Sequence, residues 1–134
     1  VGVLEGKGPL SNETIIVGAH YDHLGRGGQG SLAPWTSDIH NGADDNASGT
    51  TGLLEVAYRL TQRKQKSRRR IVFIAFSAEE RGLLGSAHYV REPRFPLEKT
   101  VAMVNMDMVG RMADNKLIIT GTVPRLSGIP CWTG

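Results

Sequence analysis

The chain of 134 residues is long enough for one domain, and its apolar content of 40% is enough for a core. A net charge of +3 does not indicate a nucleic-acid-binding protein, because six of the 16 basic residues fall between Arg63 and Arg70 and the remainder of the chain is net acidic. This basic block lacks the aromatic residues on which single-stranded nucleic acids stack. We interpret it as a solvated connection, with a contact to phosphate groups or a membrane surface as the alternative.

Membrane and export signals are not indicated either. No apolar stretch reaches the roughly 20 residues that a membrane-spanning helix needs, and residues 1–9 have neither the basic start nor the apolar core of a signal peptide. The single cysteine, Cys131, cannot form a disulfide within the chain. We expect a soluble globular protein, and its compartment stays open.

Strand and helix patterns alternate along the chain. The apolar run at 14–20 predicts a buried strand, and the glycine-rich segment 25–43 predicts a loop. A helix is predicted at 47–62, where the apolar residues at helical spacing are Leu53, Val56, Ala57 and Leu60. The later predicted elements are a strand at 70–77, a helix at 77–91, a strand at 100–106 and a short strand at 116–120.

The order of these elements predicts an α/β fold. In the second predicted helix, the residues expected to face inward are Leu83, Leu84, Ala87 and Val90, and Pro93 ends the helix. Strands that alternate with helices imply right-handed crossovers and a largely parallel sheet between the helices. The carboxyl ends of the strands then form the binding crevice.

Four polar clusters follow the apolar segments and so fall at this crevice. They are His20-Tyr21-Asp22-His23, Asp44-Asp45-Asn46, Glu79-Glu80 and Asp107. Carboxylates and imidazoles brought together from several strand ends are what a divalent metal site for hydrolysis requires. The clusters therefore predict a metal-dependent hydrolase.

Each cluster also has a purely structural interpretation. His20 and Asp22 share one side of a strand, which suits an imidazole ligand with a supporting carboxylate, but unrelated surface residues have the same spacing. Asp44 precedes a helix, where free backbone N–H groups and the helix dipole stabilise a carboxylate. Capping accounts for one of Asp44 and Asp45 but not for two adjacent acids.

The glutamate pair and Asp107 are harder to explain without a cation. Glu79 and Glu80 repel each other unless a cation or a shared proton offsets their charges, with solvation at a helix start as the alternative. Their side chains diverge, so one can bind a metal while the other acts as a general base towards water. Asp107 lies among apolar residues after a buried strand, and a buried carboxylate needs a cation or strong donors beside it.

Taken together, the clusters resemble metallopeptidase family 28, the co-catalytic zinc aminopeptidases that include secreted bacterial leucyl aminopeptidases. The resemblance lies in four ordered blocks: GAHYDH at 18–23, NGADDNASG at 41–49, FSAEERGLLGS at 76–86 and NMDMVG at 105–110. It implies a three-layer α/β/α domain of the zinc-exopeptidase type, with a mostly parallel central sheet that is incomplete here.

The resemblance also implies metal ligands. His20 and Asp107 match the terminal ligands of one zinc ion, and Asp44 matches the carboxylate that bridges two ions. Glu80 matches a ligand of the second ion. Two zinc ions are therefore expected.

Catalytic roles follow in the same way. Glu79 matches the general base, and Asp22 matches the carboxylate that orients the histidine ligand. Asp45 matches the residue after the bridge, where the family often has a cis peptide. The implied reaction is removal of N-terminal amino acids from peptides by a zinc-activated water, so the expected partner is a peptide substrate.

One departure concerns the second ion. In the family it also takes a histidine from far beyond the position of Asp107, and this sequence has no histidine after His88. His23 and His40 are the available substitutes, but His23 should point away from His20 on a regular strand, and His40 lies in a predicted loop. The second site is thus expected to be incomplete.

The length is a further departure, since family catalytic domains are longer. We interpret residues 1–122 as a partial catalytic domain and residues 123–134 as an irregular tail, in a truncated form of the enzyme. An excised fragment and a compact relative are the alternatives. Sheet edges left uncovered in a truncated form would favour self-association.

Two other functions stay open. One is a single-zinc acyl transferase of the glutaminyl-cyclase type, which shares the fold, and the other is a non-catalytic member that binds proteins. The 41–49 block and the Glu79-Glu80 pair favour the two-metal peptidase. A secreted or periplasmic location is favoured by the resemblance alone.

Overall fold

The computed structural model describes residues 1–28, 30–112, 114–116 and 118–121. Among these residues, four strands form one mixed sheet with the order β1-β3-β2-β4. The strands are β1 (Gly2–Leu4), β2 (Thr14–His20), β3 (Arg70–Phe76) and β4 (Thr100–Asn105). The helices are α1 (Gly49–Gln62), α2 (Leu84–Arg91), the π-helical segment η1 (Ala43–Ser48) and the 3-10 turn η2 (Leu97–Lys99). The predicted α/β fold is confirmed.

The parallel part of the sheet is β3-β2-β4. β2 pairs with β3 without a shift from Thr14 opposite Arg70 to His20 opposite Phe76, and it pairs with β4 on its other side. β1 adds an antiparallel strand outside β3, which makes the sheet mixed. The sequence did not indicate β1, because a three-residue strand is too short to show a periodic pattern.

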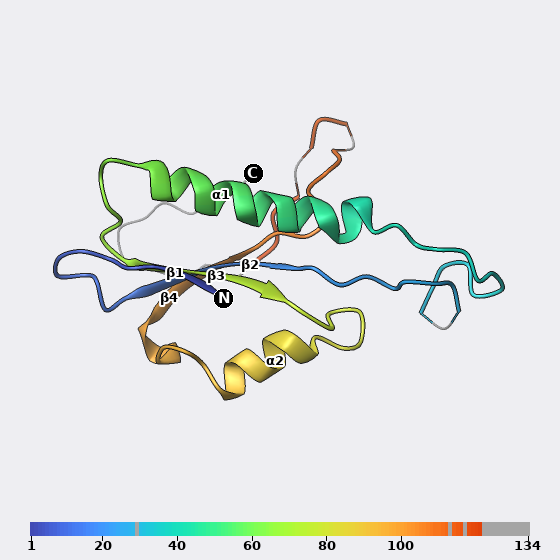
Figure 1. Ribbon diagram of the computed structural model, residues 1–134, viewed down its shortest axis with the longest axis horizontal. Coiled ribbons are helices and arrows are strands. Elements are labelled where there is room, and N and C mark those ends of the chain that lie inside the picture. Colours follow the sequence, from blue (N-terminus) through green and yellow to red (C-terminus); the bar gives the residue numbers. More distant parts are fainter. Residues whose placement is uncertain (29, 113, 117, 122–134) are drawn as a thin grey trace.

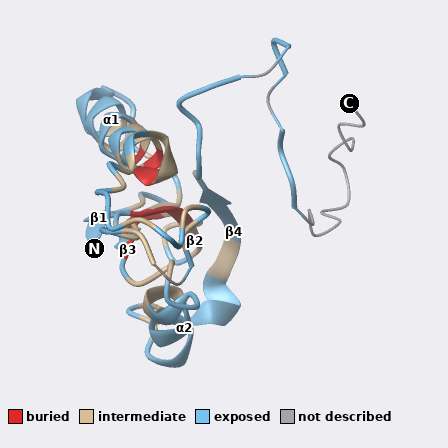
Figure 2. Cartoon of the chain, turned by 90° about the vertical axis from the view of Figure 1, so that its right-hand side faces the viewer, coloured by how far each residue is buried: buried red, intermediate tan, exposed pale blue. Residues whose placement is uncertain are grey.

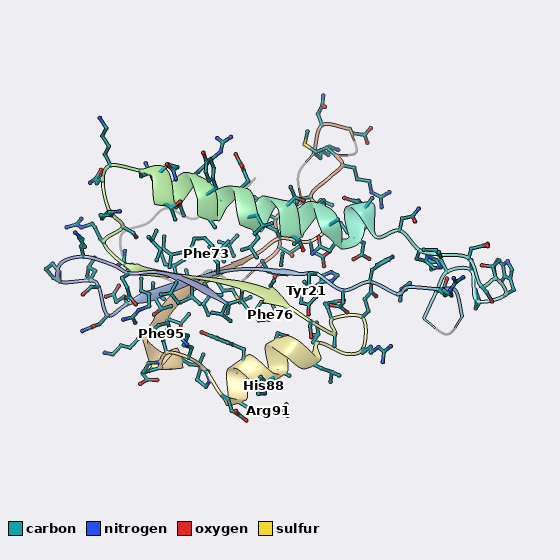
Figure 3. The ribbon with its side chains drawn as sticks, in the orientation of Figure 1. Tyr21, Phe73, Phe76, His88, Arg91 and Phe95 are labelled. Carbon is teal, nitrogen blue, oxygen red and sulfur yellow. The ribbon has the colours of Figure 1, made fainter. Side chains whose placement is uncertain are left out.

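The helices lie on opposite sides of the sheet (Figure 1). Alternate residues of a strand point to opposite faces, so Phe73 of β3 packs with Leu53 of α1, whereas Phe76 faces the side of Tyr89 in α2 (Figure 3). The other inward residues predicted for α1 are confirmed too, since all pack against the core: Val56, Ala57 and Leu60. β2 and β3 are thus covered by an apolar layer on each face.

The prediction for α2 is wrong in its start and its inward face. The helix begins at Leu84, because residues 77–83 form a turn in which Ala78 and Leu83 have positive φ angles of 55° and 60°. None of the four residues expected inside is buried, and Leu84 is 54% exposed. The short helix contacts the core through Tyr89 instead.

The far edge of the sheet is open in the described part of the chain. Met103 and Val104 of β4 are 50% and 54% exposed, and Figure 2 shows this strand largely in the exposed colour. The strand predicted at 116–120 is not formed, since residues 118–120 have no regular structure. Residue 117, the predicted tail at 123–134 and Cys131 lie outside the described residues.

Among the described residues, no helix is both long enough and apolar enough to span a membrane.

Candidate metal centre

The strand ends bring three of the four polar clusters together. Because β2 and β3 are in register, their last residues, His20 and Phe76, lie side by side, and Tyr21 N donates to the carbonyl of Phe76 at 3.0 Å. On the other side, Met106 N donates to the carbonyl of Gly18 at 2.9 Å, which brings Asp107 to the same end of the sheet. The convergence predicted from the sequence is therefore present in the fold.

His20 presents one ring nitrogen to two carboxylates. Its side chain is 3% exposed, and its Nδ1 is hydrogen-bonded at 3.1 Å to the carbonyl of Asp22, so that Nδ1 carries the proton. The other ring nitrogen, Nε2, faces Asp45 Oδ1 at 3.2 Å and Asp107 Oδ1 at 3.5 Å. A backbone carbonyl that fixes the tautomer in this way is usual behind a metal-binding histidine.

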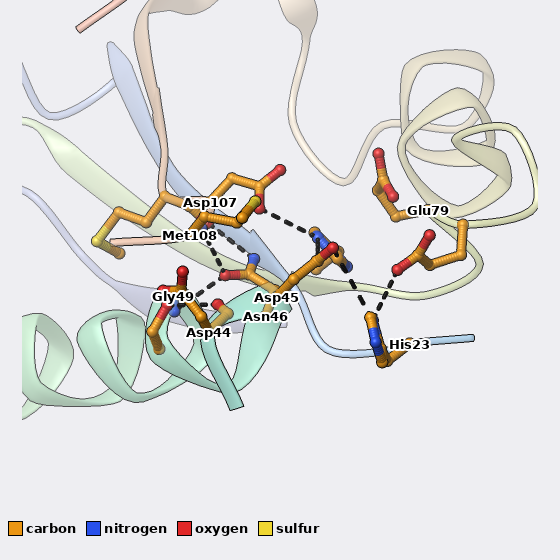
Figure 4. A network of polar contacts seen from close by, with 12 residues as sticks. His23, Asp44, Asp45, Asn46, Gly49, Glu79, Asp107 and Met108 are labelled. Atoms are coloured by element: carbon orange, nitrogen blue, oxygen red, sulfur yellow. Dashed lines mark hydrogen bonds and ion pairs between the residues drawn. The ribbon is translucent and has the colours of Figure 1, made fainter. Parts of the chain in front are cut away.

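A second group of possible ligands adjoins the first. His23 Nδ1 lies 2.8 Å from Glu80 Oε1 and 3.9 Å from Asp45 Oδ2. In each group, His20–Asp45–Asp107 and His23–Asp45–Glu80, the ligand atoms lie within 4.8 Å of one another. Asp45 thus belongs to both groups and turns one oxygen towards each imidazole (Figure 4).

The sequence predicted that His23 points away from the cluster, and this prediction is wrong, because His23 lies beside Glu80 and Asp45. The prediction assumed that strand alternation continues past His20, but β2 ends there. The segment after the strand has no regular structure, and there His23 lies 2.8 Å from Glu80, which follows the neighbouring strand.

Asp44, the expected bridging ligand, lies elsewhere. Its Oδ1 accepts a hydrogen bond from Gly110 N at 2.9 Å, and its Oδ2 forms an ion pair with Arg111 Nε at 2.8 Å. Asp44 therefore binds the loop after β4, and Asp45 occupies the place between the imidazoles. The cis peptide bond of this segment joins Asp45 to Asn46.

Asn46 is a positioning residue, to which the sequence analysis assigned no role beyond its place in the Asp44-Asp45-Asn46 cluster. It is 1% exposed, and its Nδ2 donates to the carbonyl of Met106 at 3.0 Å. Its Oδ1 accepts from Gly49 N at 3.0 Å and from Met108 N at 3.2 Å. These three hydrogen bonds of Asn46 join the start of α1 to the end of β4, so that Asp45 and Asp107 are held near each other.

Asp22 supports the glutamate turn more than it supports His20. Its Oδ1 accepts from Glu79 N at 3.1 Å and its Oδ2 from Glu80 N at 3.3 Å. The carboxylate is 3.8 Å from His20 Nδ1, too far for a good hydrogen bond, and the carbonyl of Asp22 makes that contact instead. Asp22 thus links the ends of β2 and β3.

Glu79 faces open space beside the imidazole. Together with His20 and Asp107 it lines a pocket of about 210 Å³, to which Phe76, Leu83 and Met103 contribute apolar side chains. Burial raises the pKa of Glu79 above its ordinary value, and Glu80 adds to this while His20 opposes it. Among the described residues, Glu79 belongs to neither ligand group. Its carboxylate is therefore free to exchange a proton.

The pKa of His20 is also raised. Burial by itself lowers this pKa, but the negative charges of Asp107, Glu79 and Asp45 and the hydrogen bond to the carbonyl of Asp22 together outweigh burial. The pocket is thus an acidic cluster around a buried imidazole.

Comparison with known proteins defines the class to which this fold and site belong. The model of Peptidase family M28 matches residues 1–127, nearly the whole chain. The chain belongs to this family.

Named relatives agree with that assignment. The chain is 38% identical over 111 residues to aminopeptidase YwaD of Bacillus subtilis (strain 168), which covers 82% of this chain and 21% of the relative. It is 36% identical over 109 residues to leucine aminopeptidase 2 of Trichophyton rubrum, covering 81% of this chain and 19% of the relative. It is 38% identical over 104 residues to leucine aminopeptidase 1 of Uncinocarpus reesii (strain UAMH 1704), covering 75% of this chain and 25% of the relative.

The chain spans about a fifth to a quarter of the length of these relatives. No solved structure matches it significantly.

Proposed function

We propose that this protein is a metal-dependent aminopeptidase, which removes N-terminal amino acids from peptides. The observation that carries the proposal is the place of Asp45, whose two oxygens face the imidazoles of His20 and His23. A carboxylate shared by two ligand groups suits a pair of ions that act on one substrate. Membership of Peptidase family M28 and the names of the relatives support the same reaction.

The residues present fit divalent cations. Five carboxylates surround the two imidazoles, and so many negative charges at one strand end need a positive charge among them. Imidazole and carboxylate ligands suit zinc, and the same donors accept cobalt or manganese. We assign His20 and Asp107 to one ion and Glu80 to the other. The carboxylate between the two ions is then Asp45, instead of Asp44 as the family resemblance implied.

The side chains of the pocket supply the proton transfers. A divalent ion bound here would lower the pKa of water and polarise the peptide carbonyl. Glu79 takes a proton from the attacking water on its carboxylate and returns it to the leaving amine. Because burial raises the pKa of Glu79, its protonated form is easier to reach during the reaction.

The arrangement of helices supports the finer fold proposal. α1 and α2 pack on opposite faces of β2 and β3, as they would in a three-layer α/β/α domain of the zinc-exopeptidase type.

The test combines metal content with turnover. The chain is loaded with zinc, freed of excess metal and measured by elemental analysis and by hydrolysis of leucyl-p-nitroanilide. The variant Glu79→Gln should retain zinc but lose nearly all turnover, whereas the control Glu98→Gln, in the distant turn η2, should keep both. If the chain bound zinc but showed no turnover that depends on Glu79, the peptidase function would be rejected and a protein-binding member of the family would be favoured. Absence of zinc binding would reject the metal centre itself.

A further inference from the structure

His23 contacts the candidate centre without being needed by the mechanism above. Its Nδ1 is hydrogen-bonded to Oε1 of Glu80 at 2.8 Å, and the two side chains are only 20% and 18% exposed. We propose that His23 is a positioning residue, which donates its Nδ1–H to Glu80 and thereby holds the Glu80 carboxylate beside Asp45. This inference rests on the proposed metal-dependent function and adds a residue to it.

The distance between the two side chains is that of a direct hydrogen bond. The Nδ1 of His23 and the Oε1 of Glu80 lie 2.8 Å apart, which is the length of a charge-assisted hydrogen bond. His23 therefore binds Glu80 directly, as partners behind metal ligands commonly do.

The surroundings of His23 hold its ring in this orientation. On one side, Gly42 has a positive φ of 65°, and a Cβ at that position would lie 3.0 Å from Cβ and Cγ of His23. On another side, the ring of His40 meets the ring of His23 edge-on at 6.1 Å, and His40 Nε2 is hydrogen-bonded to Ser31 Oγ at 2.9 Å. The loop before η1 thus packs against the imidazole.

Glu80 needs such a partner because of its neighbours. Its backbone N–H is held by Asp22, but its side chain has several rotatable bonds and lies near the acids Asp45 and Glu79. Repulsion between carboxylates favours rotamers that turn Glu80 away from the cluster when no cation is bound. A donor from His23 offsets this repulsion and keeps the carboxylate in place before the ion arrives.

The experiment is a calorimetric titration of the metal-free chain with zinc, supported by visible absorption of the cobalt-loaded chain. The variants are His23→Ala, His23→Asn and the control His88→Ala, which removes an exposed histidine of α2 (Figure 3). Asparagine places an amide N–H near the position of Nδ1, but this nitrogen does not bind metals.

We expect two binding steps in the unmodified chain and in His88→Ala. In His23→Ala the stronger step should be unchanged and the weaker step should lose about 10- to 100-fold in affinity. In His23→Asn most of the loss should be recovered, and the cobalt spectrum should keep its shape because no ligand has changed.

Three results would overturn the proposal. Unchanged affinities in His23→Ala would show that His23 positions nothing. A loss in His23→Asn as large as in His23→Ala, with an altered cobalt spectrum, would identify His23 as a ligand rather than a donor. If the unmodified chain bound no metal, the proposed function would fail first, and this inference with it. If circular dichroism shows that His23→Ala does not fold, His23→Gln replaces it. The glutamine amide extends past the position of Nδ1 and therefore does not restore the hydrogen bond to Glu80.

Discussion

Asn46 donates a hydrogen bond of 3.0 Å from its side-chain amide to the carbonyl of Met106, sixty positions further along the chain. The two residues directly follow and directly precede the acids that face His20, namely Asp45 and Asp107. A single buried amide thus brings together ligands from two distant segments. Its contribution to stability and to the site can be measured separately.

Replacing Asn46 by alanine should destabilise the fold strongly. The variant leaves the N–H groups of Gly49 and Met108 and the carbonyl of Met106 without their partner in a buried place. We expect the free energy of unfolding to fall by about 2–4 kcal/mol, measured by urea denaturation. The control Asn41→Ala, at an exposed position, should change it by less than about 0.5 kcal/mol. If the two variants lost equal amounts of unfolding free energy, the proposed role of the Asn46 hydrogen bonds would be contradicted.

Amide substitution should weaken zinc binding far more at Asp45 than at its neighbour Asp44. Asp45→Asn removes the carboxylate common to both ligand groups, so zinc affinity should drop by more than about 100-fold. Asp44→Asn keeps an oxygen that accepts from Gly110 and loses only an ion pair with the exposed Arg111, so zinc affinity should change by only a few-fold. Zinc titration of the two variants measures both values. The reverse ranking would restore Asp44 as the bridging ligand.

The metal-free chain should become less stable as the pH rises from about 5 to 8. The folded-state pKa values of His20 and Glu79 are both raised, His20 against the effect of burial and Glu79 because of it. Each group therefore holds a proton in the folded state that the unfolded chain has already released, and this stabilisation is lost as the pH rises through the folded-state pKa.

Denaturant midpoints measured with a chelator at several pH values test this expectation. With saturating zinc the trend should reverse, because the ligands bind metal only after losing their protons. Midpoints that rise with pH in the chelator would contradict the assigned directions.

Self-association through the edge of β4 stays a prediction, and a substitution on that strand can test it. β4 is the last strand in the described sheet, and its Met103 and Val104 are about half exposed. Val104→Lys should shift the apparent mass in concentration-dependent light scattering towards the monomer. Leu54→Lys, which replaces an exposed leucine on α1, serves as the control and should leave the apparent mass unchanged. An identical response of both variants would exclude the β4 edge.

The sequence was sufficient to predict the α/β fold and the meeting of its polar clusters. Buried strands such as β2 and β3 have long apolar runs, and parallel pairing then places whatever follows them at one end of the sheet. The ligand roles of His20, Glu80 and Asp107 stay predictions, although the structure brings each of them into a possible ligand group.

The choice between Asp44 and Asp45 could not be predicted, because it depends on backbone angles within η1. Asp45 and Asn46 have non-helical φ/ψ values there, and this turn directs one acid to the imidazoles and its neighbour to the loop at Gly110. The direction of His23 was predicted wrongly for a related reason, since it is set after the regular strand has ended. Alternation of side chains determines direction only inside a strand.

The unshifted pairing of β2 with β3 limits how this protein can vary in length. One residue inserted within either strand would slide the segment after His20 past the segment after Phe76 by about 3.3 Å and turn every following side chain to the other face. Evolutionary insertions and deletions should therefore collect in the connections at 24–41 and 63–69, where the chain can change its length without separating the two strand ends.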